Sequence, residues 1–137
     1  MRHASRVAGI LIICSMVAAT LAAEMPLIAD PSVPAATGKI NFEHDKNHNI
    51  KFHIDTKHLA RPDSLTPPKQ AYIVWIQPRG KDPQNAGVLT VDQNLQGSFR
   101  GTTPYQTFDV FITAEDSPSA DHPSGQQILH GTVQAQS

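Results

Sequence analysis

The fold is decided by two alternating runs in the first half of the chain, Gly38-Lys39-Ile40-Asn41-Phe42-Glu43-His44 and His48-Asn49-Ile50-Lys51-Phe52-His53-Ile54-Asp55. Apolar and polar residues alternate in both runs, so each places its apolar side chains on one face of an extended strand. Only Asp45-Lys46-Asn47 separates them, which is typical of a short turn. The two runs therefore predict an antiparallel hairpin with one buried face and one face in water.

Further runs of strand character follow at similar spacing, with loops rich in proline, glycine, serine and aspartate between them. They cover residues 70–77, 86–91, 97–100, 106–115 and 127–133. The run 70–77 is apolar on both faces, which indicates a central strand whose second face is covered by a loop or a partner. No segment predicts a helix. We therefore expect an all-β protein, with a single Ig-like antiparallel β-sandwich of about seven strands over residues 37–134.

The composition agrees with this class and excludes several functions. The 137 residues include 11 prolines and 8 glycines, which suit short strands joined by turns. The formal net charge is −1, and no basic stripe that would bind nucleic acid is visible. The only cysteine, Cys14, precedes the predicted domain, which therefore has no disulfide, no thiol nucleophile and no cysteine-based metal site.

Residues 1–23 have the pattern of a secretory signal peptide. Arg2 and Arg6 precede the apolar run 7–19, and small residues follow up to Ala23. The alternative is an uncleaved membrane anchor, since the apolar stretch nearly reaches spanning length. Both interpretations place the domain outside the cytoplasm, in the periplasm or the extracellular space. Residues 24–36 contain three prolines and no periodicity, so we expect an extended leader there.

Several motifs in the second half of the chain carry a family resemblance. They are Tyr72-Ile73-Val74-Trp75-Ile76-Gln77-Pro78, Ala86-Gly87-Val88-Leu89-Thr90-Val91-Asp92, Gly97-Ser98-Phe99, Phe108-Asp109-Val110-Phe111-Ile112-Thr113-Ala114-Glu115, Pro123-Ser124-Gly125 and Ile128-Leu129-His130-Gly131. With these motifs, residues 37–134 resemble the extracytoplasmic C-terminal domain of anti-sigma-K factors. The resemblance implies an Ig-like interaction or sensing domain at the bacterial cell envelope. The segment before the leader is too short for that family's sigma-binding domain, so we expect no sigma-factor binding.

Four residues in and after the central run are candidates for contact with a partner protein. Exposed aromatic side chains at Tyr72 and Trp75 would act as interface hot spots. Arg79 and Lys81 lie in a proline-bounded loop, where binding residues concentrate. The alternative for Trp75 is burial in the core, as is usual for a tryptophan in a sandwich, and Tyr72 suits either position.

The histidines His44 and His48 flank the hairpin turn and are candidate metal ligands. Two facing imidazoles bind copper or zinc when a third ligand joins them, and Asp45 or His122 would be that ligand. The alternative is that both are ordinary polar residues at the wet end of a hairpin. The second function that we consider is therefore a periplasmic copper- or zinc-binding protein.

Catalysis has little support in the sequence. His53 and Asp55 would supply two members of a serine triad, but no nucleophile motif and no acid–base pair of carboxylates occurs. We predict a non-enzymatic, exported Ig-like interaction or sensing module that needs no cofactor. Its expected partner is an envelope protein, and it contacts the membrane only if the N-terminal segment is uncleaved.

Overall fold

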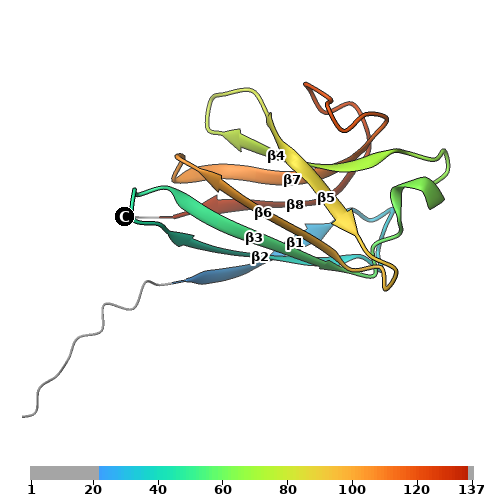
Figure 1. The fold of residues 1–137 in the computed structure, drawn as a ribbon, viewed down its shortest axis with the longest axis horizontal. Coiled ribbons are helices and arrows are strands. Elements are labelled where there is room, and N and C mark those ends of the chain that lie inside the picture. Colours follow the sequence, from blue (N-terminus) through green and yellow to red (C-terminus); the bar gives the residue numbers. More distant parts are fainter. Residues whose placement is uncertain (1–21, 136–137) are drawn as a thin grey trace, which may run out of the picture.

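A computed structural model describes residues 22–135, in which nearly all regular structure is β-strand (Figure 1). The strands are β1 Ala23–Ala29, β2 Thr37–His44, β3 Ile50–Lys57, β4 Ala71–Pro78, β5 Gln84–Val91, β6 Gly97–Thr103, β7 Thr107–Glu115 and β8 Gln127–Gln134. A single 3-10 turn, η1 (Pro62–Ser64), lies between β3 and β4. Within residues 22–135, no helix has the length and apolar character needed to cross a membrane.

The strands close into an antiparallel barrel in the order β1-β2-β3-β6-β5-β4-β7-β8. The structure is all-β, as the alternating runs predict, but the prediction of an Ig-like sandwich of about seven strands is wrong. A sandwich consists of two separate sheets. Here β1 pairs with both β2 and β8, and β5 pairs with both β4 and β6, so the two sheets are joined along both sides.

Strand β1 lies in the segment 24–36 that we expected to be an extended leader. Its pattern is weak because it contains Pro26 and because Leu27 is its only fully buried side chain. Leu27 packs against the backbone of Gly131, where an added Cβ would lie 2.9 Å from its side chain. The barrel therefore begins at Ala23 and not at residue 37. The predicted signal peptide, apart from its last two residues, lies outside the described residues.

The two sheets are joined only near one end of the barrel. β5 and β6 pair at two positions, residues 90–91 with 97–98. β1 and β8 also pair at two positions, residues 28–29 with 129–130. Beyond these positions the two sheets have no shared ladder, and they separate toward the opposite end.

We call this opposite end the open end. It carries the turn 45–49, the loop 79–83, the turn 104–106 and both ends of the described chain (Figure 1). The residues at the open end therefore come from distant parts of the sequence.

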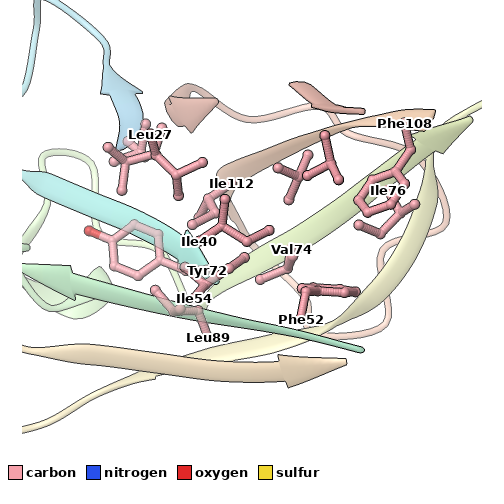
Figure 2. Close-up of a cluster of buried hydrophobic side chains, with 14 of the residues drawn as sticks. Leu27, Ile40, Phe52, Ile54, Tyr72, Val74, Ile76, Leu89, Phe108 and Ile112 are labelled. Carbon is pink, nitrogen blue, oxygen red and sulfur yellow. The ribbon is translucent and has the colours of Figure 1, made fainter. Parts of the chain in front are cut away.

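The core consists of inward-facing side chains from the whole barrel. Ile40, Ile50 and Ile54 are completely buried, which confirms the predicted inner face of the β2–β3 hairpin. Figure 2 shows Tyr72, Val74 and Ile76 of β4 within the same cluster. This continuous apolar interior supplies most of the stabilisation, because each buried aliphatic side chain contributes about 1.5–3 kcal/mol.

The first prediction tests whether β1 belongs to the barrel. We expect Leu27→Ala to lower the free energy of unfolding by about 2–4 kcal/mol, because it removes a buried side chain from a packed core. Ile28→Ala is the matched control, because the neighbouring side chain is 59% exposed and its loss should cost less than about 0.5 kcal/mol. Urea unfolding gives both values. Equal and small effects would mean that β1 does not pack on the barrel.

Candidate functional site

A groove of about 480 Å³ crosses the outer face of β2, β3 and β6 near the open end. Side chains alternate along each strand, so the paired row Phe42, Phe52 and Gly101 turns inward and its backbone forms the floor. The walls are two outward-facing rows of paired residues, Asn41, His53 and Arg100 on one side and Glu43, Lys51 and Thr102 on the other. Register alone therefore brings six polar side chains from three strands around one groove.

The groove is positively charged toward β3 and β6. Lys51 and Arg100 are both exposed, and neither makes an ion pair or a side-chain hydrogen bond within residues 22–135. They lie diagonally across the β3–β6 pair, since Lys51 faces Thr102 and Arg100 faces His53. Glu43, on β2 opposite Lys51, is the carboxylate of the groove. An anionic group at the β6 side would therefore meet Arg100 and Lys51, of which Lys51 already has the carboxylates of Glu43 and Asp45 nearby but makes no ion pair with them.

The imidazole of His53 does not form a serine triad. Its Nε2 lies 3.1 Å from Ser98 Oγ and 3.3 Å from Asp55 Oδ1. In a triad the serine and the carboxylate contact different ring nitrogens, so that one nitrogen takes the serine proton while the other is held by the carboxylate. Here both partners contact the same nitrogen. The arrangement orients the ring at the groove wall and does not activate Ser98.

The predicted contact residue Tyr72 lies in the interior. Its side chain is completely buried, and its hydroxyl donates a 2.6 Å hydrogen bond to the carbonyl oxygen of Ala60. Burial raises the pKa of Tyr72 to about 12, so the hydroxyl keeps its proton. Tyr72 therefore stabilises the connection between β3 and β4 and offers no surface to a partner.

Trp75 is also completely buried, but on the outer face of β4. There it forms a second apolar cluster with Ala71 and Ile73, and its ring stacks on Phe111 of β7 at a centroid distance of 6.4 Å. The loop 116–126, which we call the cover loop, folds over this cluster through Ala120. The expectation that a loop or a partner covers the second face of β4 is thus met by the loop, and Trp75 has the predicted alternative role of a core residue.

The cover loop is fastened by the buried carboxylate of Glu115. Trp75 Nε1 donates to Thr113 Oγ1 at 2.7 Å, and the Thr113 hydroxyl donates to Glu115. Ser124 donates from its hydroxyl at 2.7 Å and from its backbone N–H, and the Gly125 N–H donates at 3.0 Å. Burial acts to raise the pKa of Glu115, but the hydrogen bonds from Thr113, Ser124 and Gly125 outweigh it and hold the pKa below its ordinary value.

Arg79 and Lys81 lie on the loop at the open end, where both are exposed as predicted for contact residues. Lys81 Nζ lies 3.3 Å from the hydroxyl of Tyr105 and 5.1 Å from its ring centroid. The hydrogen bond from Lys81 lowers the pKa of Tyr105 below its ordinary value of 10.0. Lys81 therefore has a partner within the chain, whereas Arg79 makes no ion pair among the described residues.

Gln106 contacts both candidate metal ligands, His44 at its ring and His48 at its backbone carbonyl. His44 Nε2 lies 2.6 Å from the side-chain oxygen of Gln106, and Gln106 Nε2 donates to the carbonyl oxygen of His48. Asp45 accepts backbone N–H bonds from Asn47 and Asn49 and so shapes the turn. In the described part of the chain, no group of three or more His, Cys, Asp or Glu side chains could hold a metal ion.

Comparison with known proteins adds no family. The chain matches no protein-family model and no curated protein. The motifs behind the resemblance to anti-sigma-K factors lie in β4 to β8 and in the cover loop, where Ser124 and Gly125 hold Glu115. In this structure those motifs therefore form the apolar centre and its cover, and the groove lies on other strands.

Sequence reasoning did not single out Lys51 and Arg100. The available signal was the polar face of the β2–β3 hairpin, which contains Asn41, Glu43 and Lys51. Arg100 joins that face only through the pairing of β3 with β6, which links residues about fifty positions apart. Local patterns do not encode such a pairing.

The second prediction concerns Glu115. We expect Glu115→Gln to lower the free energy of unfolding at neutral pH by about 2 kcal/mol or more, because the charge is lost and only one acceptor oxygen remains for four donors. The NH2 group of the new amide is itself a donor, so it would face other donors without forming a hydrogen bond. Glu24→Gln is the control, since that side chain is 60% exposed and makes only a 3.9 Å ion pair with Lys39.

The third prediction is the pH dependence of the same variant. The pKa of Glu115 is lower in the folded state than its ordinary value of 4.5, so its contribution is fully present above that value. It is lost as the pH falls below 4.5 and through the folded pKa. The difference in unfolding free energy between the wild type and Glu115→Gln should therefore shrink over this range. A difference that stays constant down to the acid transition would contradict this linkage.

Proposed function

We propose that this protein is an exported, non-enzymatic interaction module that binds another protein at the bacterial cell envelope through the groove on β2, β3 and β6. The observation behind this proposal is the uncovered groove with Lys51 and Arg100, two exposed cations that make no ion pair among the described residues. Exposed and unpaired charges on a rigid sheet are suited to steering and orienting a partner.

The contrast between the outer faces of the two sheets supports a binding role for the groove. The outer face of β4 and β7 is apolar and is covered by the chain's own loop. The outer face of β2, β3 and β6 is polar and has no comparable cover within residues 22–135. Its backbone is paired between β2 and β3 and between β3 and β6 along the groove, so a partner meets a surface that is already ordered and loses little free energy in fixing it.

Export is supported by the signal-peptide pattern of residues 1–23. The resemblance to an extracytoplasmic domain supports the same location. A binding role is favoured over a hydrolase because the His53 ring, which would be the general base, has both neighbouring partners on one nitrogen.

The fourth prediction tests this function with three double variants of the full chain. The protein is expressed with a C-terminal tag in its native host, crosslinked in the intact envelope, and recovered partners are identified by mass spectrometry. We expect one enriched envelope protein with the wild type and its loss with Lys51→Gln/Arg100→Gln, because both groove cations are removed. Lys57→Gln/Arg61→Gln removes two exposed cations outside the groove and should retain the partner.

The third variant, Arg79→Gln/Lys81→Gln, separates the groove from the loop at the open end. If it alone abolishes recovery, the partner binds the loop and the groove proposal fails. Recovery of nothing above an untagged control would count against an interaction module. Fractionation of the same cells tests export, which is excluded if the protein remains in the cytoplasm.

A further inference from the structure

We infer that the groove takes an extended, acidic polypeptide segment, with one carboxylate lying between Lys51 and Arg100. This inference rests on the proposed function and specifies the chemistry of the partner. It follows from charge complementarity, because neither cation makes an ion pair among the described residues and the two belong to opposite walls of one groove. A carboxylate between them would accept charge-assisted hydrogen bonds from both sides.

The shape of the groove favours an extended segment over a compact ion. The groove crosses three adjacent strands, β2, β3 and β6. Neighbouring strands lie about 4.8 Å apart, so the distance from β2 to β6 is about 10 Å, which is the length of about three extended residues. Asn41 and Thr102 provide further hydrogen-bonding groups on the walls along this path.

The charge along the groove also gives the segment a direction. Lys51 and Arg100 lie on β3 and β6, whereas Glu43 lies on β2. A second carboxylate is therefore disfavoured at the β2 side, where it would face Glu43. The segment that fits best has its acidic residue toward β6 and a neutral or basic residue toward β2.

The chain's own N-terminal segment does not match this chemistry. Ala22, the first described residue, lines the groove and directly follows residues 1–21 in the sequence. Those residues contain Arg2 and Arg6 and no acidic residue. Charge complementarity therefore favours a segment of another protein.

The test is a titration of the ¹⁵N-labelled protein, purified after export from an expressing bacterium, with three probes. The first is a hexapeptide of alternating glutamate and threonine, blocked at both ends; the second has glutamine in place of glutamate; the third is inorganic phosphate. We expect the glutamate peptide to shift the amide signals of Lys51, His53, Arg100 and Thr102. We expect the glutamine peptide to bind at least about tenfold more weakly, and added salt to weaken the glutamate peptide.

Three variants make the result specific to the groove. Lys51→Gln/Arg100→Gln should weaken the glutamate peptide at least about tenfold, and Lys57→Gln/Arg61→Gln should leave it unchanged. Glu43→Gln should strengthen it about two- to fivefold, because a half-buried carboxylate that repels the glutamate side chains is removed from the groove. A merely structural role for Glu43 would not produce tighter binding.

Three outcomes would overturn the inference. Phosphate that matches the glutamate peptide in affinity would show a simple anion site. Equal binding of the glutamate and glutamine peptides would show that the carboxylate is not recognised. Absence of peptide binding, with an envelope partner that still depends on Lys51 and Arg100, would reject the acidic segment but leave the proposed function standing.

Discussion

The structure depends on burying both faces of β4. Residues 71–76 are completely or almost completely removed from solvent, although only one face of this strand can point into the barrel. The inner face joins the main core (Figure 2), and the outer face needs a separate cover. The chain provides that cover by folding the loop 116–126 back and holding it through Glu115. A buried carboxylate is unfavourable unless its donors are in place, so the cover loop and the carboxylate stabilise each other.

Most of the strands can be predicted from local sequence pattern, but the closure of the barrel cannot. The β2–β3 hairpin and the two-sided burial of β4 follow from alternation and apolar content, which depend on neighbouring residues. Closure depends instead on two short seams, each of two residue pairs, between β5 and β6 and between β1 and β8. Strand β1 has one fully buried side chain and a proline, so its own pattern is weak. Its position is determined by pairing with β2 and β8. A sandwich and this barrel therefore share most of their local patterns.

Local sequence pattern also fails to predict the candidate site. The aromatic residues Tyr72 and Trp75 attract attention in the sequence, but large apolar side chains on a two-sided strand are needed for the core. His44 and His48 are close in sequence, yet Gln106 occupies the ring nitrogen of one and the carbonyl of the other. The groove arises from register, because the β3–β6 pairing places Arg100 beside a hairpin whose polar face was predictable. The residues that stand out in the sequence include buried or already hydrogen-bonded ones, whereas the groove residues come together only by pairing across strands.

The two outer faces of the barrel differ: one is covered by a loop and contributes to folding, and the other is uncovered. On β4 and β7, Trp75 and Glu115 are buried under the cover loop, and their side chains are committed to folding. On β2, β3 and β6 the core residues point inward, so the outward charges at the groove can change with little effect on the interior. The charged residues of such a surface can therefore suit a ligand without a loss of stability. For that reason we assign the proposed role in recognition to the groove rather than to the aromatic strand β4.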